Sequence, residues 1–162
     1  MSTTTTTTIP NGLNGRVLQE GYGSEAWHGP DLKAALADVS AELAFWRPAA
    51  GRHNIAEIAI HHAYCAHSVR GRLSETAPEA FALKGEDWFA LSGKGGLGWS
   101  EVVAAVDTQQ QRLTALVDDI DSGRVRSPLS EAERFALVLG ITCHAVYHAG
   151  QVQLIKRLHA RE

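Results

Sequence analysis

Two histidines in the C-terminal part of the chain, His144 and His148, are separated by about one helical turn. Side chains four residues apart share one face of a helix at about 5 to 6 Å. Two imidazole nitrogens, each about 2.0 to 2.1 Å from a zinc-like ion, can bridge that distance, although surface or core histidines show the same spacing. The stripe continues through Gln151 and Ile155 beside apolar residues. It predicts that both histidines face the interior, where an imidazole needs a partner.

An earlier helical segment supplies a third candidate, His61, on a half-buried stripe that also contains Cys65. If this segment faces the C-terminal one, three neutral imidazoles meet and leave an open coordination position, as in catalytic zinc sites. We therefore predict a divalent-metal site formed by His61, His144 and His148. Ligands of this type suit zinc or nickel, and the ion would lower the pKa of a bound water or thiol.

Other residues on the same segment are alternatives. His62 is rotated by about 100° from His61, so only one of the two can easily face the metal. His67 lies too far along the helix to replace His61. Cys65, one turn after His61, is either a fourth, soft ligand or a buried thiol that packs as a small hydrophobe. The remaining histidines lie near segment ends and are expected at the surface: His28, His53 and His159.

Three further side chains are candidates for roles beside the metal. Tyr147 and Gln151 flank the histidine pair and either hydrogen-bond to its members or simply pack. Glu57, one turn before His61, can orient a ligand or accept a proton, although helix capping explains it equally well. No catalytic triad order, phosphate-binding glycine loop or Walker-like lysine is found, so nucleotide-dependent chemistry has no support.

Apolar periodicity predicts four long helices and no sheet. Residues 13–28 are rich in glycine and form either a short helix or a covering loop, whereas residues 74–98 form a long connection of the kind that often covers a site. The fold class is therefore all-α, a four-helix bundle with a long connection between its second and third helices. The predicted helices cover residues 30–46, 54–73, 100–120 and 130–159.

Composition favours one globular domain. The chain has 162 residues, 44% hydrophobic and 20% charged, with a net charge of -3 that gives no electrostatic reason to bind nucleic acid. Residues 1–12, with six consecutive threonines, are predicted to be a disordered tail, which leaves residues 13–162 as the domain. Neither a secretory signal nor an apolar stretch of about 18 residues is recognised, so no membrane association is expected. Two cysteines are too few for a disulfide framework and fit a reducing cytoplasm.

Several segments resemble the DinB-like (DinB/YfiT-like) metalloprotein superfamily. Residues 46–48 and 53–61 resemble the end of its first helix and the start of its second, and residues 144–151 resemble its fourth-helix signature. Residues 27–30 and 86–88 add to the likeness, which runs in the right order along most of the chain.

The resemblance implies an up-up-down-down helical bundle, frequently a homodimer. It also implies a metal held by one histidine of the second helix and two of the fourth, which by position are His61, His144 and His148. One departure is Ala145, because many relatives have asparagine after the first histidine of the fourth helix.

The members of this superfamily point to several reactions. They include thiol S-transferases and isomerases that use bacillithiol, mycothiol or glutathione, together with proteins described as metal-dependent hydrolases. The leading expectation is a metal-dependent transferase that activates a low-molecular-weight thiol toward a small-molecule substrate. The alternatives are a metal-dependent hydrolase and a non-catalytic, metal-binding or stress-associated dimeric module.

Overall fold

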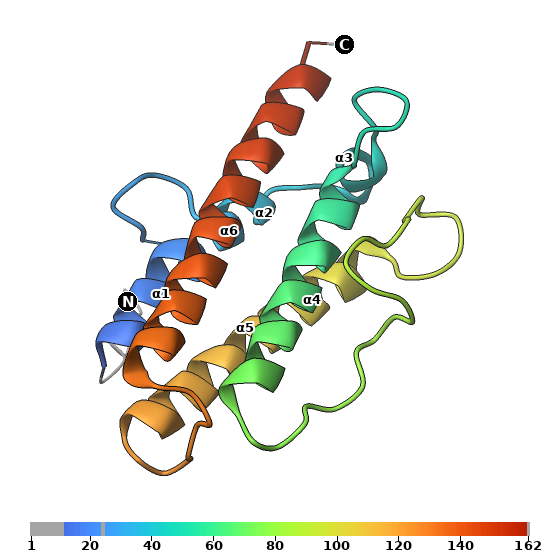
Figure 1. Ribbon diagram of the computed structural model, residues 1–162. Helices are drawn as coiled ribbons and strands as arrows, with labels where there is room; N and C mark the ends of the chain where they lie inside the picture. The colour runs from blue at the N-terminus through green and yellow to red at the C-terminus, as the bar shows by residue number, and fades with distance from the viewer. Residues whose placement is uncertain (1–11, 24, 162) are drawn as a thin grey trace, which may run out of the picture.

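The computed structural model describes residues 12–23 and 25–161, and within these residues helices are the only regular elements. Four helices of ten residues or more pack side by side, and two short helices connect the first of them to the next (Figure 1). The all-helical prediction is confirmed. The expected tail lies outside the described residues except for Gly12, the N-cap of α1. The helices are α1 (Leu13–Tyr22), α2 (Leu32–Leu36), α3 (Ala41–Phe45), α4 (Ile55–Leu73), α5 (Trp99–Asp121) and α6 (Glu131–His159).

Local capping determines where the long helices begin. Asn54 and Ser130 each accept a hydrogen bond from the backbone N–H three residues on, and the carboxylates of Glu57 and Glu133 accept one from the cap residue, so α4 and α6 both begin with a capping box. The predicted start of α5 lies two residues too late. Its N-cap is Gly98, whose N–H donates to the Glu101 carboxylate at 2.8 Å.

The predicted helix over residues 30–46 is broken. Asp31 caps α2 by accepting from the Ala34 N–H at 3.0 Å, and Ser40 begins a second helix by accepting from the Leu43 N–H at 3.2 Å. Ser40 lies in the middle of the apolar stripe, and its side chain accepts a hydrogen bond from a backbone N–H while its own backbone is not helical. Such a cap favours a new helix start over continuation of the first helix. The apolar stripe is therefore present, but the prediction of one continuous helix is wrong.

The glycine-rich segment forms α1, which packs on α5 and α6 as the first long helix, the role predicted for residues 30–46. Gly21 allows the close approach, since a Cβ atom there would lie 3.0 Å from the Ala145 Cβ on α6. The Tyr22 hydroxyl donates to Asp107 of α5 at 2.7 Å, and Asn14 at the other end of α1 donates to Asp121 at 3.0 Å. These contacts show that α1 runs antiparallel to α5.

Two core clusters establish the directions of the other helices. The first half of α4 packs with Val102 near the start of α5 and Val152 near the end of α6. The second half of α4 packs with Val117 near the end of α5 and Val138 near the start of α6. Thus α4 and α5 run one way and α1 and α6 the other, as Figure 1 shows. Along the chain the order is up-down-down-up, which corrects the expected up-up-down-down order. The long connection over residues 74–98 returns the chain to the end at which α4 begins, so α4 and α5 run parallel.

Helix α6 is the one described helix that is long and apolar enough to cross a membrane, with a mean hydropathy of 1.3 in its most apolar window. This corrects the expectation that no such stretch exists. The core helix of a soluble protein meets the same criterion, and α6 contributes residues to both core clusters.

Candidate metal centre

The three predicted histidines converge between α4 and α6. The Nε2 atoms of His61 and His148 each lie 3.1 Å from Nε2 of His144. The ring centroids of the three pairs are 4.3 to 5.2 Å apart. His61 and His148 are buried, at 6% and 3% exposure, and His144 is half-buried. The three rings therefore gather at one place between the two helices.

Two of these rings are held in one tautomer by acceptors on their far side. Nδ1 of His61 lies 2.8 Å from the backbone carbonyl oxygen of Asp87. Nδ1 of His148 lies 2.6 Å from Oε1 of Gln151, the neighbour predicted beside the pair. Since a carbonyl or amide oxygen can only accept a hydrogen bond, Nδ1 carries the hydrogen in both rings and Nε2 presents a lone pair. Ligating histidines in metal sites are held in this way.

This arrangement leaves an unsatisfied set of lone pairs. Nε2 of His61 and Nε2 of His148 both point at Nε2 of His144, which can offer at most one hydrogen to the two of them. A cation satisfies all three nitrogens together. Bonds of about 2.0 to 2.1 Å at tetrahedral angles place two nitrogens about 3.3 Å apart, close to the 3.1 Å found here. The His61–His144 and His144–His148 pairs therefore each have about the nitrogen separation that two ligands of one divalent ion require.

The electrostatics agree with neutral rings. Burial, followed by the two neighbouring imidazoles, lowers the pKa of His144 to about 4. Burial also lowers the pKa of His148, against the opposing effect of Gln151. Both are neutral at pH 7, the form required for ligation.

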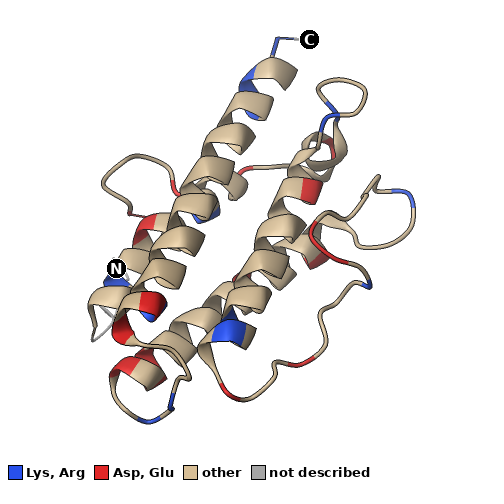
Figure 2. Ribbon diagram, viewed as in Figure 1, with Lys and Arg blue, Asp and Glu red and all other residues tan. Residues whose placement is uncertain are grey.

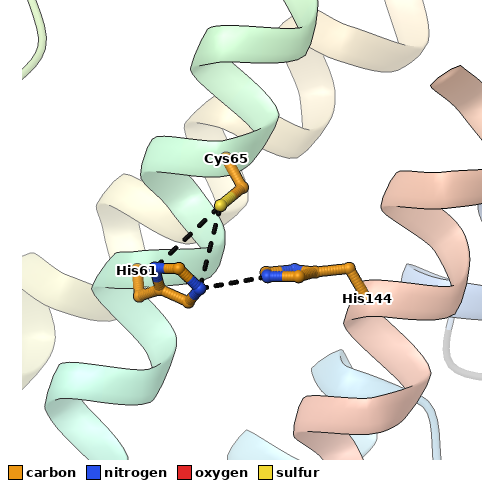
Figure 3. A group of neighbouring side chains, drawn as sticks. All are labelled: His61, Cys65 and His144. Atoms are coloured by element: carbon orange, nitrogen blue, oxygen red, sulfur yellow. Dashed lines mark hydrogen bonds between the residues drawn. The ribbon is translucent and has the colours of Figure 1, made fainter. Parts of the chain in front are cut away.

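Cys65 also reaches the site. Its Sγ lies 3.8 Å from Nε2 of His61, and one ligand atom each of His61, Cys65 and His144 lie within 4.8 Å of one another (Figure 3). Burial raises the pKa of the Cys65 thiol to about 11, with a smaller contribution from Asp87, so the thiol is protonated at pH 7 in the absence of an ion. This group of three is compatible with divalent-metal binding.

His62, which the helical geometry predicts to point away from the site, contacts the centre. Its Nδ1 lies 3.2 Å from Nδ1 of His144, and its side chain is almost completely buried. Burial is the largest cause that lowers the pKa of His62 to about 3, with Gln110 opposing it. The adjacent pair His61 and His62 is the sequence signal for this contact. His62 meets His144 through Nδ1, the nitrogen opposite to the one that faces His61 and His148.

The connection over residues 74–98 closes one side of the centre. The indole of Trp88 is stacked between two imidazoles, 3.7 Å from the His53 ring and 4.0 Å from the His61 ring. Asp87 has a φ of 66°, and its carboxylate also lies 3.2 Å from Nδ1 of His61. Among the described residues it is the one non-glycine with positive φ, a conformation that an asparagine or aspartate tolerates better than most residues.

Glu57 anchors this connection. Its buried carboxylate accepts from Arg47 at 2.5 and 3.0 Å and from the Leu91 N–H at 3.1 Å. His53 lies 3.1 Å from the same carboxylate and is exposed, as expected from the sequence. Tyr147 is 65% exposed and its ring lies 5.3 Å from that of His148.

Comparison with known proteins assigns the chain to a family. Residues 26–152 match the DinB superfamily, which covers the histidines of the centre, the Asp87–Trp88 segment and Gln151. The chain belongs to the DinB superfamily. No curated protein and no solved structure matches it. Helix α1 lies outside the DinB match, so its packing against α5 and α6 is known from this structure rather than from the family comparison.

Proposed function

We propose that this DinB protein is a metal-dependent enzyme that transfers a low-molecular-weight thiol to a small electrophilic substrate. The observation that carries the proposal is the meeting of three imidazoles at Nε2 of His144, because a centre with three imidazole ligands keeps a fourth position for a thiol or water. A zinc or nickel ion bound there supplies positive charge that lowers the pKa of a coordinated thiol, which makes it a better nucleophile at pH 7.

The surrounding residues divide the remaining tasks. His61, His144 and His148 hold the ion, while the Asp87 carbonyl and Gln151 keep two of the rings in the ligating tautomer. We prefer His148 to Cys65 as the third ligand because its Nε2 lies 3.1 Å from Nε2 of His144 and needs no deprotonation in its present tautomer, whereas the Cys65 thiol has a raised pKa. Trp88 stacks on His61 and covers one face of its ring.

The expected activity is testable with thiol and electrophile panels. Protein loaded with zinc or nickel should consume glutathione, mycothiol or bacillithiol together with a haloalkyl or maleimide-type electrophile, and chelation should abolish the acceleration. His148→Ala should lose at least about 100-fold in rate, the size expected when a ligand rather than a supporting contact is removed. The matched control is His159→Ala, at the end of the same helix. Absence of turnover with every thiol, in protein that holds one ion per chain, would contradict transferase chemistry.

Two other functions use the same centre. A coordinated water would serve hydrolysis, and cleavage of activated esters or amides without any added thiol would favour it over thiol transfer. The low exposure of His61 and His148 favours a third function, a metal-binding module without turnover. In that case metal removal would lower the melting temperature while no reaction is lost.

The proposal also covers the helices that form the bundle and the cellular compartment of the protein. We propose that α1, α4, α5 and α6 are the four-helix bundle of the superfamily. We also propose that the protein works in the cytoplasm on a small molecule, since both cysteines, Cys65 and Cys143, are free.

We further propose that the protein is a homodimer in which α6 pairs antiparallel with its copy. Residues 135–155 contain no Asp, Glu, Lys or Arg, so the middle of α6 is uncoloured by charge in Figure 2. Large apolar side chains are exposed along this helix. The exposed positions along α6 are spaced symmetrically about the point between residues 146 and 147, so an antiparallel copy presents the same spacing. Antiparallel pairing also sets the acidic first turn of one copy against the basic last turn of the other. The stripe pairs Phe135 with Leu158, Leu139 with Leu154 and Cys143 with Gly150 of the second copy.

The pairing predicts a specific cross-link. In Gly150→Cys, the new thiol should form a disulfide with Cys143 of the second copy on mild oxidation, which gives a covalent dimer on a non-reducing gel. A Cβ atom added at Gly150 would meet no neighbouring atom within 4 Å, so the substitution fits. The control, Gly150→Cys combined with Cys143→Ser, should lose this cross-link. A monomer by light scattering would contradict the dimer.

A further inference from the structure

His62 is buried against His144, but the proposed function gives it no role. It is 1% exposed, and its ring lies 5.4 Å from that of His144 with an angle of 23° between the planes. The two Nδ1 atoms are 3.2 Å apart, within hydrogen-bond distance. His62 therefore meets His144 through the nitrogen opposite to the one that faces His61 and His148.

The two facing Nδ1 atoms permit one hydrogen between them. If it lies on His144, then Nε2 of His144 is a lone pair directed at the other two imidazoles. If it lies on His62, then His144 can carry its own hydrogen on Nε2, where it blocks the approach of a cation. The choice of tautomer at this one contact therefore decides whether the centre offers three lone pairs or two.

We propose that His62 is a positioning residue for the metal centre, whose Nδ1 accepts the hydrogen of His144 Nδ1 and so keeps His144 in the ligating tautomer. It completes a set in which each of the three rings has its own acceptor: the Asp87 carbonyl for His61, Gln151 for His148 and His62 for His144. This inference rests on the proposed metal centre, but it concerns a residue that does not touch the ion.

The test compares two substitutions of His62 by zinc affinity, measured in competition with a chromogenic chelator. His62→Phe keeps a ring of similar shape but removes the acceptor, and zinc affinity should fall about 10- to 100-fold. His62→Asn places a carbonyl oxygen near the position of Nδ1 and should bind zinc more tightly than His62→Phe. His67→Phe, on the same helix, is the control and should bind zinc as the wild type does. Circular dichroism of the metal-free proteins verifies that each variant is folded.

Tautomer assignment by nitrogen NMR of the zinc-loaded wild type tests the same claim without any substitution. The expected result is hydrogen on Nδ1 of His144 and on Nε2 of His62. The inference is overturned if His62 carries its hydrogen on Nδ1, if His62→Phe binds zinc as tightly as the wild type, or if His62→Asn loses as much affinity as His144→Ala, which would make His62 a ligand. A wild type that binds no zinc would instead overturn the proposed function.

Discussion

The His148→Ala variant should lose its bound divalent ion. Wild-type protein is expected to hold about one zinc or nickel ion per chain, and removal of one of three imidazole ligands should weaken binding by more than about 100-fold, beyond the loss caused by removing a supporting hydrogen bond. The physical reason is that two remaining nitrogens leave half of a tetrahedral shell to water. Elemental analysis after dialysis against a weak chelator measures the difference.

Cys65→Ser is the informative partner of that variant. Because Sγ of Cys65 lies near His61 but carries a thiol with a raised pKa, we expect this variant to retain metal within a few-fold of the wild type. If Cys65→Ser loses the ion while His148→Ala keeps it, the ligands are His61, Cys65 and His144, and the assignment of His148 is wrong.

Replacement of Glu57 should have the largest effect on stability. Its carboxylate is 3% exposed. It accepts hydrogen bonds from Arg47 and from the backbone N–H groups of Asn54 and Leu91. Glu57→Gln keeps the shape but removes the charge, so Arg47 loses its partner and the residues 74–98 lose an anchor. We expect the free energy of unfolding to fall by about 3 kcal/mol. Urea unfolding measures this, with the exposed Glu75→Gln as the control.

The contribution of Glu57 to the free energy of unfolding should decrease as the pH falls. Burial alone would raise the pKa of this carboxyl, but the hydrogen bonds from Arg47, Leu91 and His53 together hold it below its ordinary value of 4.5. A carboxyl with a lowered folded-state pKa contributes its full stability above the unfolded value and loses it as pH falls through the folded value. The gap between wild type and Glu57→Gln should therefore narrow below about pH 4.5. A gap that widens on acidification would contradict this role.

The proposed metal ligands were predictable because helical periodicity carries the necessary information. His144 and His148 share one face of α6 by spacing alone, and His61 lies on the side of α4 that turns toward them. The same periodicity could not reveal His62. A rotation of about 100° separates it from His61, but the His144 ring lies across both positions and contacts one histidine of α4 with each of its nitrogens.

The rest of the centre depends on contacts that leave no pattern in the sequence. The carbonyl oxygen that holds His61 belongs to the backbone of Asp87, and every residue has such a group. Its position results from the left-handed conformation of a residue in a long connection without periodicity. Similarly, the sequence left α1 open between a helix and a loop because glycine disfavours isolated helices, whereas Gly21 is what allows α1 to pack closely on α6.

X-ray absorption at the metal edge tests most directly whether three imidazole lone pairs converge on an ion. For zinc-loaded wild-type protein without added thiol, we expect three imidazole nitrogens and one oxygen at about 2.0 to 2.1 Å and no sulfur at about 2.3 Å. A spectrum with two imidazoles and one sulfur, or with fewer than three imidazoles and additional oxygens, would contradict the centre formed by His61, His144 and His148.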